Sequence, residues 1–284
     1  MDTQTKSFVS KARNILMFAA AVLSMILSYQ VWSSSDEPLT LYLPAINQHE
    51  SGLEKKIESE FRNQGLKSFQ VKGTVFWHPF QSGIRTGKKG VYFAQPHMAA
   101  WAIAKHNFDP VFRLHGRLNF VLATTRANTK LFELDDLNGK VICHESGLNL
   151  GTLWLEDILG GYQIAANRRE VTNIEATIQD AIEAQKCDAF VLENLAYERT
   201  NKTAGGKYIR LAQSAFFKHN VFIAHPELTS REKLVLRKAL KSAKLKELLK
   251  PYLLNLSKWD NLVEVSEEDY SLQDSLILEP YWGR

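Results

Sequence analysis

The chain has 284 residues and a net charge of +4, with 45% hydrophobic and 23% charged residues. This composition excludes an intrinsically disordered chain and is typical of a globular protein. The mild charge does not favour a nucleic-acid-binding protein, so we expect no nucleic acid as a partner. The length suits two domains of ordinary size or one large domain.

The N-terminal residues have the pattern of an export signal. Basic residues precede an apolar run at residues 15–27, and a serine-rich linker follows it. A positive region before an apolar run of this length is typical of a secretory signal peptide. No Ala-x-Ala site follows, and Val31-x-Ser33 is only a weak cleavage site. Cleavage at this site would release the mature protein, whereas an uncleaved anchor over residues 15–32 would hold it at the inner membrane. We therefore expect residues 1–36 to be a signal or anchor with a linker, and the rest to lie in the periplasm.

Residues 37–120 alternate between strand and helix patterns. The spacing Asn47-x-x-Glu50 is a capping box that opens a helix, and Pro96 suits the first turn of another helix. Such alternation predicts a parallel sheet with helices on its faces. The predicted elements are, in chain order, a strand at 39–43, a helix at 50–63, a strand at 67–75, a short helix at 80–86, a strand at 91–94 and a helix at 96–105.

The alternation of strands and helices is interrupted after residue 116. Residues 117–125 have the pattern of a long strand, and no long helix is predicted between the helix at 96–105 and this strand. Such a strand could cross between domains. Capping boxes at Thr172-x-x-Glu175 and Thr229-x-x-Glu232 open two later helices. The predicted elements are a short helix at 131–137, a strand at 140–143, a helix at 152–159, a strand at 169–171, a helix at 174–184, a strand at 188–192, a short helix at 196–201, strands at 208–211 and 221–224, a helix at 231–248, and two short pieces within 263–278.

This order predicts an α/β protein with two lobes, mixed but mainly parallel sheets and a ligand cleft between the lobes. The first lobe would comprise residues 37–120 and 220–284, because the strand at 221–224 returns to it. The second lobe would comprise residues 121–219. Two lobes joined by two crossings form a hinge, and the cleft between them is the default ligand site.

The segment at residues 139–159 carries the clearest chemical pattern. A buried strand leads through a loop of small and polar residues into a helix. The first N–H groups of a helix lack partners within the helix, and the helix dipole adds positive charge there, so this end can bind an anion. An ordinary strand–helix turn is the alternative, since no phosphate-loop lysine is present.

Two cysteines lie in the exported part of the chain, where a disulfide is permitted. Cys143 lies near the end of one predicted strand and Cys187 at the start of another. If these strands are parallel neighbours, the two residues are offset by roughly 13 Å. A disulfide needs Cα atoms within about 7 Å of each other. We therefore expect two reduced, largely buried thiols.

Three segments follow one another in a particular order: VYFAQPHMAAWAI (91–103), ELDDLNGKVICHESGLNLGTL (133–153) and CDAFVLENLAYE (187–198). Their order and spacing resemble those of the type II periplasmic solute-binding proteins, and more closely the phosphate/phosphite/phosphonate branch of the ABC-transporter substrate-binding proteins. The resemblance covers about residues 37–275. It implies the two-lobed fold of that family and a bound small anion.

The resemblance also implies which residues bind ligand, because polar residues follow the strands of all three segments. In open α/β sheets, ligands lie outside the carboxyl ends of the strands. The family's Ser-Thr-Ser type run is replaced by Leu148-Asn149-Leu150-Gly151, so a carboxylate fits as well as a phosphate- or phosphonate-like ligand. The candidate ligand-binding residues are Gln95 and His97 from the first lobe, Ser146, Asn149, Leu150, Gly151, Thr152, Glu193 and Asn194 from the second, and Trp77 and His78 at the floor of the cleft.

The leading hypothesis is an exported solute-binding protein that captures a small anion and passes it to the membrane permease of an ABC transporter. We expect a monomer without catalytic residues, cofactor or metal. A second hypothesis is a membrane-tethered sensor or accessory subunit of the same fold, whose partner is a membrane protein. A third is an enzyme of cofactor biosynthesis, because some proteins of this fold are such enzymes and a fold does not determine function.

Overall fold

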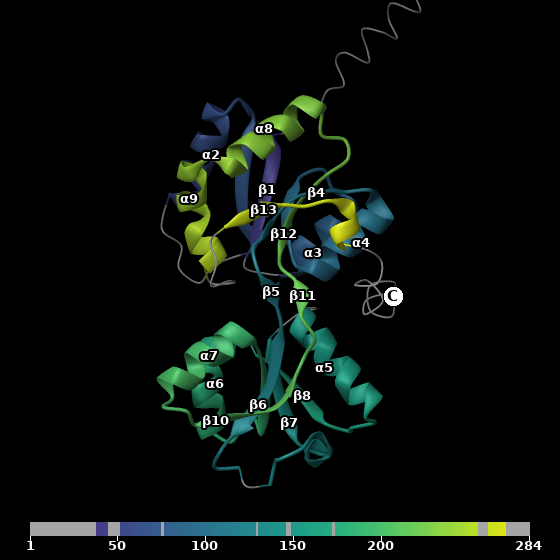
Figure 1. Cartoon of the computed structure of the whole chain (residues 1–284), viewed down its shortest axis with the longest axis vertical. Helices are drawn as coiled ribbons and strands as arrows, with labels where there is room; N and C mark the ends of the chain where they lie inside the picture. Colours follow the sequence, from purple (N-terminus) through teal and green to yellow (C-terminus); the bar gives the residue numbers. More distant parts are fainter. Residues whose placement is uncertain are drawn as a thin grey trace, which may run out of the picture. The chain divides into compact units, whose positions relative to one another are not determined.

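The computed structural model describes residues 38–44, 52–74, 77–128, 130–145, 149–171, 174–254 and 261–270. The chain divides into two compact units, Met1–Pro38 and Leu39–Arg284. The second unit contains all the elements described below, and Figure 1 labels most of them. The predicted signal or anchor and the two capping boxes at Asn47 and Thr172 lie outside the described residues. Within the described ranges, no helix is long and apolar enough to cross a membrane.

The first lobe is built on a six-stranded sheet in the order β13-β4-β12-β3-β1-β2. β1 pairs in parallel with β2 and β3, whereas β12 runs antiparallel to β3 and β4, and β13 runs antiparallel to β4. The strands are β1 (Leu39–Pro44), β2 (Phe69–Thr74), β3 (Val91–Ala94), β4 (Asp109–Leu114), β12 (Val221–Ala224) and β13 (Leu262–Glu264).

Helices cover both faces of this sheet (Figure 1). α2 (Leu53–Asn63), α8 (Ser230–Lys241) and α9 (Ala243–Leu254) bury Ile57, Phe61 and Leu240 against Leu41 of β1. α3 (Trp77–Arg85), α4 (Pro96–His106) and the 3-10 helix η2 (Glu267–Tyr270) cover the other face. Alternate strand residues therefore supply two separate cores, as the two-residue period of a strand requires.

The second lobe is built on a five-stranded sheet in the order β10-β6-β9-β7-β8. α5 packs on one face, and α6 and α7 pack on the other. β7 pairs in parallel with β8 and β9, while β6 runs antiparallel to β9 and β10. The elements are β6 (Phe120–Thr125), the 3-10 helix η1 (Leu134–Leu137), β7 (Val141–Glu145), α5 (Leu150–Gly161), β8 (Asn167–Val171), α6 (Ile174–Glu183), β9 (Ala189–Glu193), α7 (Asn194–Thr203) and β10 (Tyr208–Gln213).

Two short antiparallel strands, β5 (Arg117–Leu118) and β11 (Phe217–Lys218), connect the two sheets (Figure 1). The predicted strand at 117–125 therefore exists as β5 and β6, separated by Asn119. The prediction of mixed sheets is confirmed, but parallel pairs do not predominate. The reason is that the strands next to the two crossings, β6 and β12, run against their neighbours.

The predicted helix at 231–248 is wrong in its extent, because the chain forms two helices, α8 and α9. Ser242 between them has an extended backbone, with φ −68° and ψ 135°. Its hydroxyl oxygen accepts a hydrogen bond from the Leu245 N–H at 3.0 Å and so caps α9. The capping box at Thr229 and Glu232 is confirmed, with both reciprocal bonds present.

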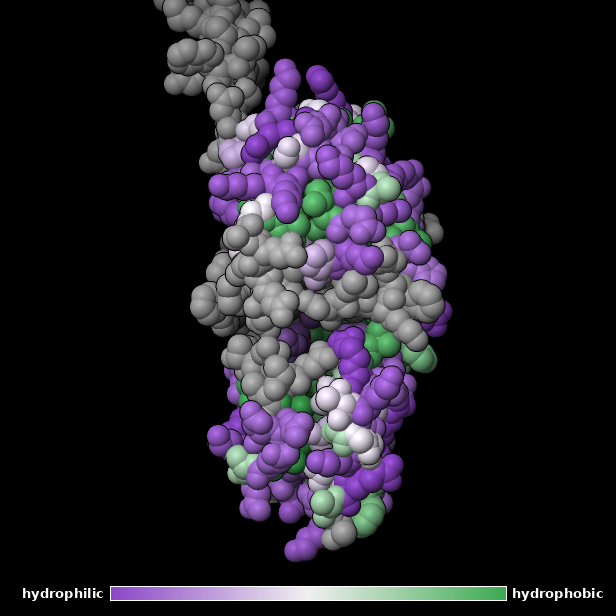
Figure 2. Space-filling model, turned by 90° about the vertical axis from the view of Figure 1, so that its left-hand side faces the viewer, coloured by the Kyte–Doolittle hydropathy of each residue, from purple (hydrophilic) through white to green (hydrophobic). Residues whose placement is uncertain are grey.

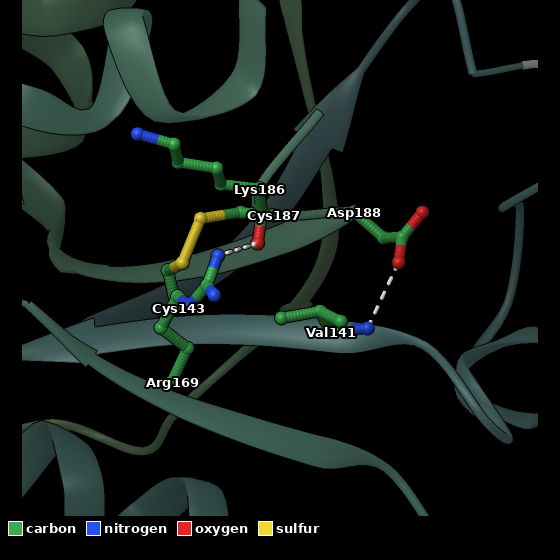
Figure 3. The surroundings of a disulfide bond; sticks show 6 residues. All are labelled: Val141, Cys143, Arg169, Lys186, Cys187 and Asp188. Atoms are coloured by element: carbon green, nitrogen blue, oxygen red, sulfur yellow. Dashed lines mark hydrogen bonds between the residues drawn. A yellow bond between two sulfur atoms is a disulfide. The ribbon is translucent and has the colours of Figure 1, made fainter. Parts of the chain in front are cut away.

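The expectation of two reduced thiols is also wrong, because Cys143 and Cys187 form a disulfide with a Cα–Cα distance of 5.7 Å. β7 and β9 are parallel neighbours, as assumed. The error lay in continuing the line of β9 back to Cys187, since β9 begins only at Ala189. The Lys186 carbonyl accepts a hydrogen bond from Arg169 of β8 at 3.1 Å, so the segment before β9 crosses over β7 (Figure 3).

Candidate functional site

β3 and β7 are each followed in the chain by a helix. β3 is followed by Gln95 and α4, and β7 leads to Asn149, which precedes α5. Ligands of open α/β sheets lie outside such strand ends. The sequence therefore placed its first two groups of candidate residues at structurally equivalent positions, one in each lobe.

Asn149 is the N-cap residue of α5 and is buried. Its side-chain oxygen accepts a hydrogen bond from the Thr152 N–H at 2.8 Å, and its amide donates to the Glu145 carboxylate at 3.1 Å. The Thr152 hydroxyl donates to the Glu145 carbonyl at 3.2 Å. These contacts fix the start of α5 against the end of β7, which leaves the two side chains engaged within the second lobe.

Gln95 makes a contact between the two lobes. It is the N-cap residue of α4, but its side chain makes no cap hydrogen bond to that helix. Instead its side-chain oxygen accepts a hydrogen bond from the Leu150 N–H at the start of α5, at 3.0 Å. An oxygen that belongs to the first lobe thus lies on one of the N–H groups that the sequence predicted to receive an anion.

Apolar contacts surround this hydrogen bond. A Cβ placed on Gly151 would lie 2.8 and 2.9 Å from two ring carbons of Phe120, so only glycine fits this close approach. Leu150 is buried in the core of the second lobe, whereas Leu153 packs with Ala94 and other residues of the first lobe. The start of α5 therefore offers backbone N–H groups in an apolar setting and no hydroxyl from Leu150.

A second polar group lies at the end of β9. Glu193 is half-buried and lies opposite Phe120 in the pairing of β6 with β9. The Asn194 N–H at the start of α7 donates to the Asn119 carbonyl at 2.8 Å. Within the described part of the chain, the buried Asn119 amide nitrogen and the buried Asn194 side-chain oxygen have no hydrogen-bond partner. Such atoms are costly unless a ligand or water satisfies them.

Sequence reasoning missed Asn119 and Phe120. Both lie where the chain crosses from β5 into β6, and Asn119 interrupts an otherwise apolar strand run. This polar residue within an apolar run was the feature of the sequence that could have indicated a ligand contact. Of the remaining candidates, His97 is buried in the first turn of α4. Trp77 and His78 open α3, but their side chains lie outside the described part of the structure, as does all of Ser146.

In the ranges that the structure describes, no group of three or more His, Cys, Asp or Glu side chains is placed to hold a metal ion.

A family model described as "ABC transporter, phosphonate, periplasmic substrate-binding protein" matches residues 70–270. The chain belongs to this family. It is therefore a periplasmic solute-binding protein of the ABC-transporter type and not an enzyme, which sets the third hypothesis aside.

Solved structures share the fold at low sequence identity. XAC2383 from Xanthomonas citri, bound to ATP, is 12% identical with a TM-score of 0.68, over 86% of this chain and 98% of that one. PhnD1 from Prochlorococcus marinus, in complex with methylphosphonate, is 14% identical with a TM-score of 0.65, over 85% and 97%. A binding protein component of an ABC phosphonate transporter, PA3383 from Pseudomonas aeruginosa, is 10% identical with a TM-score of 0.61, over 82% and 83%.

A search of curated protein sequences found no match. The structural likenesses confirm the two-lobed α/β fold of type II periplasmic binding proteins. At these identities they carry no information about which solute this chain binds.

Proposed function

We propose that the chain captures a small anion, either phosphonate- or phosphate-like or a carboxylate, between the start of α4 and the start of α5. The proposed lobes are residues 37–120 with 220–284, and residues 121–219. The protein would act as a monomer that delivers the solute to an ABC-transporter permease. We retain the ligand contacts proposed from the sequence and add Asn119. The retained contacts are Gln95, His97, Ser146, residues 149–152, Glu193, Asn194, Trp77 and His78.

The hydrogen bond between the Gln95 side-chain oxygen and the Leu150 N–H carries this proposal. It places an oxygen acceptor from one lobe on a helix N-terminal donor of the other. A ligand oxygen that replaced the Gln95 side-chain oxygen would accept the same hydrogen bond from the Leu150 N–H. A charged oxygen would bind more strongly than the neutral amide, because charge-assisted hydrogen bonds are stronger and the helix dipole adds to them.

Thermal-shift and calorimetric titrations with methylphosphonate, phosphate, phosphite and acetate test the proposal. We expect at least one of these anions to raise the melting temperature. Gln95→Glu should reduce its affinity by on the order of 100-fold, because the new carboxylate competes for the Leu150 N–H and repels the anion. Gln163→Glu adds the same charge at the far end of α5, where the side chain is exposed, and is the matched control. Binding that Gln95→Glu leaves unchanged would place the ligand elsewhere.

A second candidate is the membrane-tethered sensor or accessory subunit. The weak cleavage site after the apolar run favours it, because an uncleaved segment at 15–32 would keep the chain at the inner membrane. N-terminal sequencing of the protein isolated from membranes distinguishes the two candidates. A start near Ser33 supports the released transport component, and retention of the first residues supports the tethered one.

A further inference from the structure

The helical pair α8 and α9 carries more positive charge than any comparable part of the chain. Residues 230–254 contain eight lysines and arginines but only two acidic residues. This local excess of six charges is larger than the net charge of +4 of the whole sequence. The two helices lie on the face of the first lobe that α2 also covers. Hydrophilic side chains crowd the upper end of the coloured part in Figure 2, where α8 lies.

Ion pairs balance only part of this charge. Lys233 pairs with Asp109, and Lys244 pairs with Glu60 at 3.0 Å. The outward-facing Lys241 pairs with Glu264 at 2.6 Å. These pairs tie α8 and α9 to β4, α2 and β13, so they serve the fold.

Two further basic residues of α8 have no such role. Arg231 and Lys238 are exposed, and neither has an ion-pair partner among the residues that the structure describes. Their separation of seven residues places them on the same side of the helix. Between them on that side lies Leu234, whose side chain is 69% exposed. An apolar side chain flanked by cations can enter the headgroup region of an anionic bilayer while the cations contact its phosphates.

The helix α8 packs beside the loop that precedes β2, and this loop borders the start of β1. A methyl group of Val235 in α8 lies 3.9 Å from the position that a Cβ on Gly65 would occupy. The loop that contains Gly65 continues to Ser68, whose carbonyl accepts a hydrogen bond from the Leu39 N–H at 3.0 Å. The exposed Lys67 belongs to this loop. We define the α8 face as Lys67, Arg231, Leu234 and Lys238.

We propose that, in the tethered form given above as the second candidate, the α8 face rests on a bilayer that contains anionic phospholipids. The apolar run of the N-terminal segment extends to Trp32, and seven residue steps separate Trp32 from Leu39. Seven steps span at most roughly 25 Å. If the tethered candidate holds and the apolar run stays in a bilayer, that bilayer is close to the start of β1, where the α8 face presents exposed cations and an apolar side chain. Anionic headgroups complement that charge, and each lysine or arginine near such a surface strengthens binding roughly fivefold.

Amine footprinting of the full chain in lipid nanodiscs tests the proposal. The chain is reconstituted with phosphatidylglycerol or with phosphatidylcholine, and the labelling rate of each lysine is followed by mass spectrometry. We expect Lys67 and Lys238 to react several-fold more slowly in phosphatidylglycerol at low salt. High salt should abolish the difference, since it screens exposed charges. The exposed Lys202 and Lys207 of the second lobe are internal controls and should react equally in both lipids.

The double variant R231Q/K238Q should lose the protection of Lys67, and L234S should weaken it. Both substitutions are at exposed positions, and an unchanged response to the anion ligand shows that the variants are folded. Equal labelling in the two lipids would overturn the proposal. Protection that appears only when a permease is added would also overturn it and would assign the α8 face to a protein partner. Neither outcome bears on anion binding, so the proposed function is tested separately.

Discussion

In the first lobe, the strand that leads into the site, β3, lies between β1 and β12, and its residues are fully buried. In the second lobe, the equivalent strand, β7, lies next to the edge strand β8, whose residues are mostly exposed. β7 therefore has a mostly exposed strand on one side. The Cys143–Cys187 disulfide adds a covalent link between β7 and the segment that enters β9. The comparison shows that similar strand–helix units are held by packing in one lobe and partly by a cross-link in the other.

Hydrogen bonds beside the disulfide strengthen the same connection. Asp188 accepts a hydrogen bond from the Val141 N–H at 2.8 Å, and Arg169 donates to the Lys186 carbonyl (Figure 3). These contacts hold β7, which ends at Glu145 and precedes Asn149 in the chain. The disulfide therefore supports the second-lobe half of the site without touching it.

Removal of the disulfide should cause the largest loss of stability, and the loss should be confined to the second lobe. For Cys143→Ala/Cys187→Ala we expect the free energy of unfolding to fall by about 4 kcal/mol, since the bridged residues are 44 positions apart. Denaturant titration measures this change. Native-state hydrogen exchange should show increased opening in β7 and β9 but not in β3. Reduction of the unaltered protein should reproduce the loss, and a reductant should not affect the double variant. Equal opening in β3 would mean that the two lobes are not held differently.

Gly151→Ala should have the next largest effect. The added methyl group meets the Phe120 ring at under 3 Å, so we expect a loss of about 1–3 kcal/mol in stability and weaker anion binding. Gly160→Ala in the same helix is the matched control, because nothing lies within 4 Å of its added methyl group. It should leave stability unchanged or raise it by up to about 1 kcal/mol. Similar melting temperatures for the two variants would contradict the close contact at Gly151.

Removal of one helix cap from each lobe should lower stability by similar amounts. Asn149→Ala and Thr229→Ala each remove a side-chain acceptor from a helix start, and we expect each to lower the free energy of unfolding by about 1 kcal/mol. Only Asn149→Ala should also lower the affinity for the anion, which calorimetry measures. A loss of affinity in Thr229→Ala would show that cap removal acts through general destabilisation.

The smallest effect concerns His225, at the end of β12 in the first lobe. Burial lowers the pKa of its imidazole below the usual 6.5, more than the Gly87 backbone hydrogen bond raises it. A lowered pKa in the folded state means that stability is intact above pH 6.5 and falls as the pH drops below that value, because the unfolded chain then binds the proton first. The melting temperature should therefore fall more between pH 7 and 5.5 in the unaltered protein than in His225→Asn. Parallel pH profiles would remove His225 as the cause.

Local patterns predicted much of the fold. The strands β3 and β12 have their predicted bounds, and the capping box at Thr229 opens α8. The chain segments that the sequence missed are those whose structure depends on distant partners. β4 contains Pro110 and is held between β12 and β13, and the two-residue β11 exists only through its pairing with β5.

The site was predicted at the level of segments but not of contacts. Gln95 and Leu150 were both candidates, yet their hydrogen bond links residues 55 positions apart and depends on how two lobes meet. Asn119 and Phe120 were missed because a single polar or aromatic residue in an apolar strand does not by itself indicate a binding site.

By itself, the sequence determined the α/β class, the alternation of strands and helices, and the segments that identify the family, since these depend on hydrophobic period, caps and short motifs. Only the tertiary structure decided that Cys187 reaches Cys143, that the Gln95 side chain contacts the start of α5, and that α8 packs beside the loop next to the start of β1. The physical reason is that each of these depends on the path of the chain between elements. Turns and crossings set that path, and residue periodicity does not encode it.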